Sequence, residues 1–374
     1  MFKLIKSITD LLKFIRVKRN KKRIVFYAED KNSYLFFSGI INFLINEYNE
    51  DIYYVTSSFH DPILNNENKK INSFYIDPGT IRTIFFQLFN APIMVMTMPE
   101  LNVSYIKKSK FFCHYIYIPH NILSIHMIFR KQAFNHYDSF FCVGPHHLKE
   151  LEENEKIYNL EKINKIKFGY HKIELLLDKR KNKIKNHKTL IIAPSWGKNS
   201  ILEKIGNKLL SILVETEFKI IIRPHPDTLK FYKKGYSKLK TKYQKYENFL
   251  FEENTSNMNS YLQADLMISD WSGSAFEFAF GLEKPVIFIN LPKKINNTEF
   301  YLYKSEPIEI SLRDKIGEII DIEKLNEIPA LIKKVYENKK NYKEKIIKLR
   351  KSILYNDSSS SKIGAEYIIK LLKV

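Results

Sequence analysis

The stretch ISDWSGSAFEFAFGLEKPVIFIN (residues 268–290) places a strand, a short polar loop, an amphipathic helix and a second strand in immediate succession. The first strand ends at Asp270, and the loop Ser272-Gly273-Ser274 opens a helix that continues to Gly281. Strand–helix–strand units of this kind build parallel sheets that carry helices on both faces. The stretch therefore predicts an α/β fold.

The loop Ser272-Gly273-Ser274 also predicts an anion site. Free N–H groups and the helix dipole favour negative charge at a helix start, and Gly273 lets an oxygen approach the backbone closely. Ser272 and Ser274 add hydroxyl donors, although a serine here can also act as a helix N-cap alone. Because ligands of open α/β sheets bind at the carboxyl ends of the strands, we interpret this loop as a phosphate site.

The same alternation of apolar runs and amphipathic stretches extends on both sides of this unit. It runs over residues 24–177, stops in the polar segment DKRKNKIKNHK (residues 178–188), and resumes over residues 189–374, which end in a Lys-rich helical tail. A chain of 374 residues has the length of two such domains. We therefore expect two Rossmann-like domains that face each other across a cleft, joined by the polar linker.

A second functional signal is the segment IIIRPHP (residues 220–226). Three branched apolar residues predict a buried strand that ends directly in Arg223-Pro224-His225-Pro226. Two prolines hold His225 at the carboxyl edge of the second sheet, where a histidine can donate a hydrogen bond or a positive charge to a phosphate.

His120 occupies the equivalent position in the first domain, because it follows the apolar run YIYIP (residues 115–119). We expect it to face His225 across the cleft, where a neutral imidazole can take a proton from a hydroxyl group. His126 and His136 are expected to make structural hydrogen bonds. No metal-ligand spacing is present, so we expect no metal site, and the need for a divalent cation stays open.

The N-terminal segment MFKLIKSITDLLKFIRVKRNKKR (residues 1–23) combines an apolar stripe with many basic residues. Phe2, Ile5, Ile8, Leu12 and Ile15 recur at helical spacing, against nine Lys and Arg residues and the single acid Asp10. This pattern is typical of a helix that lies on an anionic membrane surface, and the alternative is a helix packed on its own domain with a solvated basic tail.

The overall charge and composition agree with an acidic partner. The formal net charge is +20, and no run of 18 apolar residues predicts a membrane-spanning helix. We expect a cytoplasmic protein that associates with the inner face of the cell membrane. Nucleic acid is not an expected partner, because no helix-turn-helix, RNP-like or zinc-finger pattern occurs.

Six short motifs together resemble the CDP-glycerol glycerophosphotransferase family of teichoic-acid and capsule enzymes. They occur in the family's order, and they are Pro119-His120, Gly169-Tyr170, Ala193-Pro194-Ser195-Trp196, Arg223-Pro224-His225-Pro226, Ser269-Asp270-Trp271-Ser272 and Phe276-Glu277-Phe278 followed by Lys284-Pro285.

The resemblance implies a two-lobed GT-B fold with an acceptor domain (residues 24–177) and a nucleotide-donor domain (residues 189–374). It implies that His120 is the catalytic base and that His225 contacts the donor pyrophosphate. The donor-binding residues implied are Arg223, Asp270, Ser272, Gly273, Ser274, Glu277, Ser195 and Trp196. The expected reaction moves glycerol phosphate, or a related phospho-alcohol, from CDP-glycerol or a similar donor to a glycan or lipid-linked glycan, with no tightly bound cofactor.

Two other functions stay open. The aspartate of the family's Phe-Asp-Phe motif is Glu277 here, and a helix glutamate at this place is also similar to GT-B glycosyltransferases, where it binds the ribose of a nucleotide sugar. A non-catalytic protein that binds polyanions through its basic surface is the second alternative.

Overall fold

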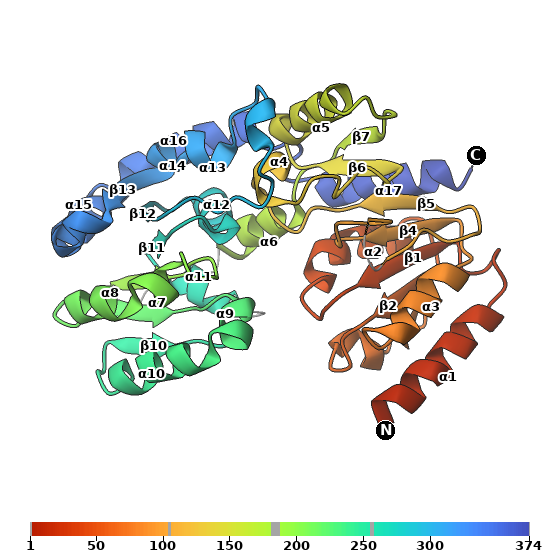
Figure 1. Cartoon of the computed structure of the whole chain (residues 1–374), viewed down its shortest axis with the longest axis horizontal. Coiled ribbons are helices and arrows are strands. Elements are labelled where there is room, and N and C mark those ends of the chain that lie inside the picture. The colour runs from red at the N-terminus through yellow and green to blue at the C-terminus, as the bar shows by residue number, and fades with distance from the viewer. Residues whose placement is uncertain (1, 104–105, 181–187, 255–257, 374) are drawn as a thin grey trace.

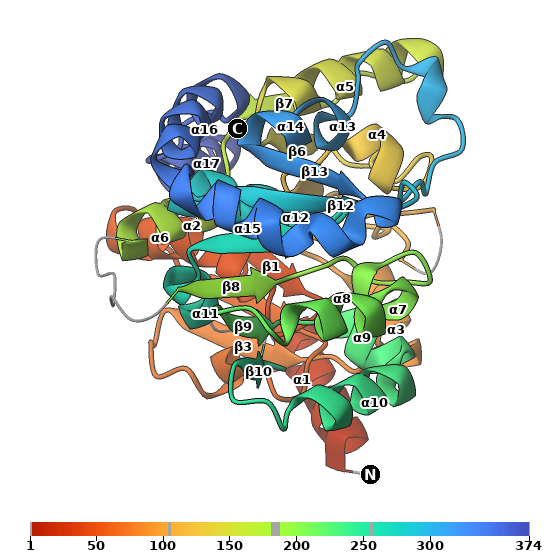
Figure 2. The same ribbon diagram turned by 90° about the vertical axis from the view of Figure 1, so that its left-hand side faces the viewer.

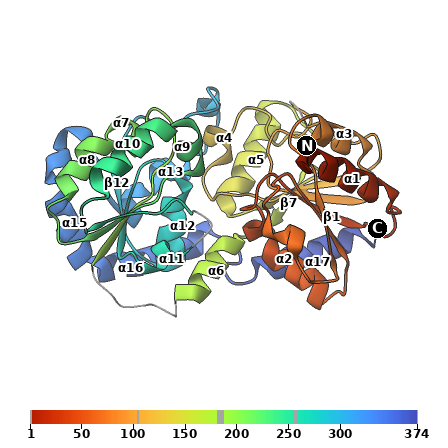
Figure 3. The same ribbon diagram turned by 90° about the horizontal axis from the view of Figure 1, so that it is seen from below.

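The computed structural model describes residues 2–103, 106–180, 188–254 and 258–373. The chain forms two lobes that lie side by side, each built on a parallel sheet with helices on both faces (Figure 1). Viewed from below, α6 (His171–Lys179) lies at the junction of the lobes (Figure 3). Of the expected linker, residues 178 and 179 belong to α6, and residues 181–187 lie outside the described residues.

The first sheet has seven parallel strands in the order β3-β2-β1-β4-β5-β6-β7. The strands are β1 (Ile24–Ala28), β2 (Ile52–Thr56), β3 (Ile71–Tyr75), β4 (Ile93–Met96), β5 (His114–Tyr117), β6 (Ser139–Cys142) and β7 (Asn164–Lys167). One face is covered by α1 (Phe2–Arg16), α3 (Thr80–Leu88), α4 (Ile125–Ile128) and α5 (Pro145–Ile157), and the other by α2 (Tyr34–Asn46) with the 3-10 helix η1 (Pro62–Asn65).

The second sheet has six parallel strands in the order β10-β9-β8-β11-β12-β13. The strands are β8 (Thr189–Ile192), β9 (Lys219–Ile222), β10 (Phe249–Phe251), β11 (Leu266–Ser269), β12 (Val286–Asn290) and β13 (Gly317–Asp321). In Figure 2 this lobe faces the viewer. One face carries α7 (Ile201–Lys204), α8 (Gly206–Leu213), α10 (Lys233–Tyr243) and α15 (Ile328–Glu337), and the other α11 (Asn259–Gln263), α12 (Gly273–Leu282), α13 (Ile308–Ser311), α14 (Arg313–Ile316) and α16 (Lys339–Ile353). The remaining short elements are α9 (Pro226–Phe231), η3 (Phe300–Leu302) and η4 (Ile322–Glu327).

The strands read as continuous apolar runs because both faces of each sheet are buried. All five residues of β1 and all four of β8 are buried, as parallel sheets covered on both sides require. In both sheets the order of the strands reverses beside the first strand, between β1 and β4 and between β8 and β11. A crevice forms at such a switch point outside the carboxyl ends of the strands, and it is where ligands bind in open α/β sheets.

The two lobes share an apolar interface. Ile122, Tyr170 and Leu176 of the first lobe join one core cluster with Phe276 and other residues of α12. Helix α6 lies close against α12 at Gly281, where an added Cβ atom would be 2.6 Å from the Cβ atom of Leu176. A glycine at this position therefore permits the close approach of the two helices.

The C-terminal helix α17 (Ser360–Leu371) does not stay with the second lobe, which corrects the expectation that residues 189–374 form one domain. It packs along α2 on the first lobe (Figure 1). Ala365, Ile368 and Ile369 complete the core cluster that covers β1 and β2. The approach is close, because a Cβ atom added at Gly39 of α2 would lie 2.1 Å from Ser361 Oγ.

Helix α1 packs on the first lobe with a face that the sequence pattern did not single out. Leu11 and Phe14 are buried, the Ser7 hydroxyl accepts a hydrogen bond from the Asp77 amide at 2.7 Å, and Asp10 accepts one from the Tyr75 amide at 3.0 Å. The predicted apolar stripe faces outward instead, with Phe2, Ile5, Ile8, Leu12 and Ile15 all exposed. Within the described residues, no helix has the length and apolarity to cross a membrane.

Candidate active site between the lobes

The start of α12 lies at the switch point of the second sheet, directly after β11. Ser272 is the N-cap of this helix, and its hydroxyl accepts a hydrogen bond from the Ser274 amide at 3.4 Å. The two hydroxyl oxygens lie 2.8 Å apart, and Ser274 Oγ donates to the Ala193 carbonyl at 3.2 Å. Gly273 and Ser274 are partly exposed. Both the predicted N-cap and an accessible helix start are therefore present.

Asp270 supports the neighbouring loop. Its carboxylate accepts hydrogen bonds from the Ser195 amide at 2.7 Å and the Ile201 amide at 3.0 Å. Its side chain is almost completely buried, and burial raises its pKa. Asp270 and Ser195, both expected at the donor site, together fix the loop that carries Trp196 at the end of β8.

Arg223 is likewise used within the second lobe. Its guanidinium donates to Glu252 at 2.7 Å and to Ser260 Oγ at 2.9 Å, and it lies 4.6 Å from the centre of the Tyr261 ring. The guanidinium group of Arg223, which we expected at the donor site, therefore contacts residues beside β10 and in α11.

His225 is the N-cap of α9 and lies near His120 of the first lobe. Its Nδ1 atom accepts a hydrogen bond from the Asp227 amide at 3.1 Å. Burial, with the nearby charges of Lys294 and His120, lowers its pKa to about 4. The ring is therefore neutral at pH 7 with its proton on Nε2, because Nδ1 is the acceptor.

His120 has the opposite arrangement. Its Nδ1 atom donates to the Thr97 carbonyl at 3.1 Å, so that the lone pair of the neutral ring is on Nε2. Edge-to-face contacts with Phe36 and Phe129 hold the ring, at 6.4 Å and 5.7 Å between centres. Burial lowers the pKa of His120, and a neutral imidazole in this orientation can accept a proton.

The two histidines and the start of α12 lie around one site. His120 is among the groups whose charge lowers the pKa of His225. A Cβ atom added at Gly273 would lie 3.4 Å from Asn121 Cβ and 3.5 Å from Leu123 Cγ, which places the loop after His120 against the start of α12. The ring of Trp196 lies 6.1 Å from that of His225.

Glu277 joins the lobes. Its carboxylate accepts a hydrogen bond from the Tyr170 hydroxyl at 2.6 Å and forms an ion pair with Lys172. Glu277 and Lys172 also act electrostatically on His120. Sequence reasoning missed Lys172, although it lies two residues after the Gly169-Tyr170 motif. It also missed Lys294, which no pattern separates from the many other lysines.

No three His, Cys, Asp or Glu side chains gather as metal ligands in the part of the chain that the structure describes.

Two lobes, each built on a Rossmann-like parallel sheet, place the chain in the GT-B fold class. The profile of the family described as CDP-Glycerol:Poly(glycerophosphate) glycerophosphotransferase matches residues 11–369, so the chain belongs to this family. No curated protein matched the chain.

Among solved structures, the chain is similar to the wall teichoic acid polymerase TagF in a structure with CDPG. The TM-score is 0.60 at 14% identity, over 99% of this chain and 94% of that one. It is also similar to the UDP-GlcNAc 2-epimerase of Methanocaldococcus jannaschii in complex with UDP-GlcNAc and UDP, with a TM-score of 0.57 at 14% identity over 94% of this chain and 100% of that one. These similarities confirm the predicted fold.

Proposed function

We propose that this protein transfers glycerol phosphate, or a related phospho-alcohol, from a CDP-linked donor to a hydroxyl group of a teichoic-acid-like or capsule glycan. Membership of the glycerophosphotransferase family supports the donor. The observation that carries the proposal is the pair of histidines at the site: His120 offers a lone pair and His225 offers an N–H group.

In the proposed reaction, the hydroxyl oxygen of the acceptor forms a bond to the phosphorus that carries the glycerol. The bond from this phosphorus to the bridging oxygen breaks, and CMP leaves with the electron pair. The proton of the hydroxyl passes to Nε2 of His120, which acts as the general base.

The phosphates of the donor would lie against the start of α12. Its N–H groups and dipole favour the negative charge, and His225 donates a hydrogen bond from Nε2. Donors that are fixed before the reaction lower the barrier because they need no reorganisation as charge develops on the leaving CMP. Trp196, beside His225, supplies an aromatic surface at the same site.

The nucleotide-sugar alternative requires Glu277 to bind the ribose of the donor. In the structure this carboxylate is already occupied by Tyr170 and Lys172, so Glu277 gives the nucleotide-sugar alternative no specific support. The third alternative, a polyanion-binding protein without activity, has no support from a chain that belongs to a transferase family.

We also propose that α1 holds the protein on the inner face of the cell membrane. Its outward face presents Phe2, Ile5, Ile8, Leu12 and Ile15 to solvent. Leu88 of α3, which packs beside α1, is also exposed. An exposed apolar stripe with basic flanks fits an anionic lipid surface, where a lipid-linked acceptor would be found.

A screen of CDP- and UDP-linked donors with a glycan primer tests the reaction. We expect release of CMP and transfer of radiolabelled glycerol phosphate from CDP-glycerol, with no transfer from UDP-sugars. Transfer of a sugar would contradict the proposal and support the nucleotide-sugar alternative.

A further inference from the structure

A segment of the second lobe crosses to the first lobe between β12 and α13. Residues 291–307, which we call the crossing segment, contact α4 and α5. The amide nitrogen atoms of Asn296 and Asn297 donate to the Met127 carbonyl at 3.0 Å and 3.3 Å, and Asn297 Nδ2 donates to the His126 carbonyl at 2.9 Å.

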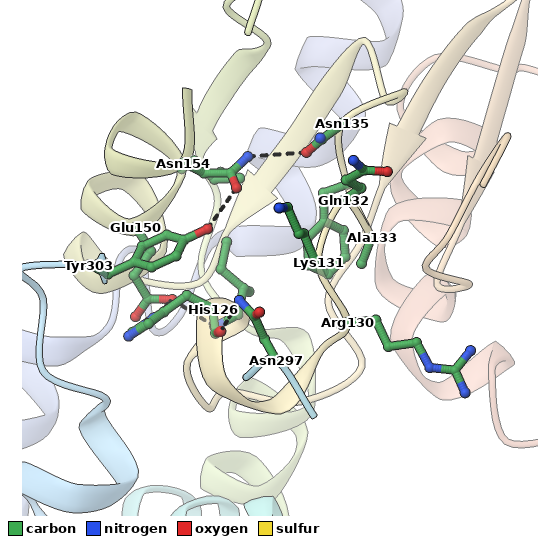
Figure 4. Close-up of a pocket in the computed structure, with 13 residues that line it drawn as sticks. His126, Arg130, Lys131, Gln132, Ala133, Asn135, Glu150, Asn154, Asn297 and Tyr303 are labelled. Atoms are coloured by element: carbon green, nitrogen blue, oxygen red, sulfur yellow. Dashed lines mark hydrogen bonds and ion pairs between the residues drawn. The ribbon is translucent and has the colours of Figure 1, made fainter. Parts of the chain in front are cut away.

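The far part of the crossing segment is fixed as well. Tyr303 donates its hydroxyl proton to Asn154 Oδ1 at 2.7 Å, and the Ser305 amide donates to Glu153 at 3.0 Å. Figure 4 shows Asn297 and Tyr303 reaching the side of the first lobe that carries His126 and Asn154. Trp271 Nε1 of the second lobe donates to the Leu291 carbonyl at 2.7 Å. Because both lobes hold the crossing segment, the position of its first residues is fixed.

Lys294 lies in this fixed segment. Its Nζ atom is 4.3 Å from the centre of the Trp196 ring. It also contributes to the lowered pKa of His225, which places its ammonium group near that ring. Two residues that we assign to the donor, one at the end of β8 and one at the end of β9, thus have the same cation as a neighbour.

The Lys294 ammonium makes no direct contact with an acidic side chain in the part of the chain that the structure describes. Asp270, Asp227 and Glu203 act on it electrostatically, but within the described residues it has no hydrogen bond or ion pair. It is partly buried, and burial lowers its pKa. A contact with an aromatic ring does not neutralise the charge of an ammonium group, so a partly buried cation of this kind is stabilised when an anion arrives.

We propose that Lys294 binds a phosphate of the nucleotide-activated donor. This inference rests on the proposed function and deepens it. The ammonium group donates a hydrogen bond to a phosphate oxygen on the side of His225 and Trp196, and the start of α12 provides N–H groups. Lys294 takes the place at the site that the sequence suggested for Arg223, whose guanidinium binds Glu252.

The variants Lys294→Gln, Lys294→Arg and Lys293→Gln test this role. Lys293 is the matched control because it is the adjacent lysine of the same segment and is exposed. We expect Lys294→Gln to weaken equilibrium binding of CDP-glycerol and CDP about ten- to hundredfold, the usual size of a hydrogen bond to a charged group. Lys294→Arg should keep most of the affinity, and Lys293→Gln should equal the wild type.

Cytidine without phosphates provides a second readout. Its binding should be the same for the wild type and Lys294→Gln, since no phosphate is present. The melting temperature of Lys294→Gln should not fall, because the substitution removes an uncompensated cation. A lowered melting temperature with unchanged affinity for CDP would show a structural role and overturn the proposal.

Failure of the proposed function gives a different pattern. If the wild type binds UDP-sugars and not CDP-glycerol, the proposed donor is wrong. The role of Lys294 can then still be tested by comparing the affinity of the wild type and of Lys294→Gln for UDP in place of CDP. If the wild type binds none of these nucleotides, both proposals are wrong.

Discussion

His120 and His225 lie at facing sheet edges with opposite hydrogen-bond roles at the same ring atom. Nδ1 of His120 donates to a carbonyl group at 3.1 Å, whereas Nδ1 of His225 accepts from an amide group at 3.1 Å. Nε2 of His120 therefore has a lone pair, whereas Nε2 of His225 has a proton. The backbone thus sets one ring as an acceptor and the other as a donor, and burial keeps both neutral by lowering each pKa.

Replacing His120 with alanine should remove the base. We expect turnover to fall by about 10²–10⁴-fold, with the affinity for a non-reacting donor analogue near that of the wild type. Steady-state rates and equilibrium binding on the same preparation check this. Loss of donor binding would assign His120 to the donor instead.

The pH profile of the wild type gives an independent test of His120. The base is active when it is deprotonated, so turnover falls as the pH falls through the pKa of His120. Since burial lowers this pKa, we expect the acid limb of turnover to lie below the usual imidazole value of about 6.5. A limb above that value would point to another base.

A neutral side chain that donates a hydrogen bond should partly replace His225. With a pKa near 4 it carries no charge at pH 7, so His225→Gln, whose amide can donate a hydrogen bond, should keep more donor affinity than His225→Ala. His225→Ala should lower both affinity and turnover, because the donor is bound in the ground state and the transition state alike. Equal losses in the two variants would show that charge, or the exact ring shape, is what the site requires.

The ion pair between Lys172 and Glu277 should contribute to stability. Lys172→Met leaves a buried carboxylate with only the Tyr170 hydroxyl, and we expect a loss of about 3 kcal/mol in the free energy of unfolding in urea. Adding Glu277→Gln should restore most of it, because the amide is neutral and still accepts from Tyr170. The exposed Lys162→Met is the control and should change stability by less than about 0.5 kcal/mol.

Membrane binding should depend on the outward face of α1. Ile5, Ile8 and Leu12 are 56%, 45% and 48% exposed, so changing all three to serine should abolish sedimentation with anionic vesicles while the melting temperature stays the same. Phe14→Ala is the contrast, since this buried side chain packs in the core and its loss should cost about 3–5 kcal/mol. Unchanged sedimentation of the triple variant would rule out this face.

Removing residues 1–23 altogether would be a poorer experiment than these substitutions. The truncation also strips Leu11 and Phe14 from the core of the first lobe, so that a loss of vesicle binding would not separate the outward face from the fold.

The fold was predictable because the alternation of buried strands and amphipathic helices is visible along the chain. The strand ends that carry His120, His225 and Ser272 follow from the same pattern, since each comes directly after an apolar run. The outward stripe of α1 was also visible, but its buried face was not. As polar residues, Ser7 and Asp10 are expected to face solvent. They are buried because they accept hydrogen bonds from the amide groups of Asp77 and Tyr75.

The partners of charged side chains were not predictable, because they depend on contacts between distant segments. Arg223 and Asp270 lie in motifs beside the site, yet their charges are taken up by Glu252 and by two backbone amides. Lys294 lies 69 residues after His225 in the sequence and reaches it only through the crossing segment. A chain with 61 Lys and Arg residues gives no signal that separates one such lysine from the rest.

The return of α17 to the first lobe means that neither half of the gene encodes a complete lobe. A product that ends at residue 180 would leave open the apolar surface of α2 that Ala365 and Ile368 cover, and a product that starts at residue 188 would carry α17 with no sheet to bury it. The two products are thus complementary, each holding what the other lacks. We expect the two products, co-expressed as separate polypeptides, to associate, because α17 of the second product buries the apolar surface of α2 on the first.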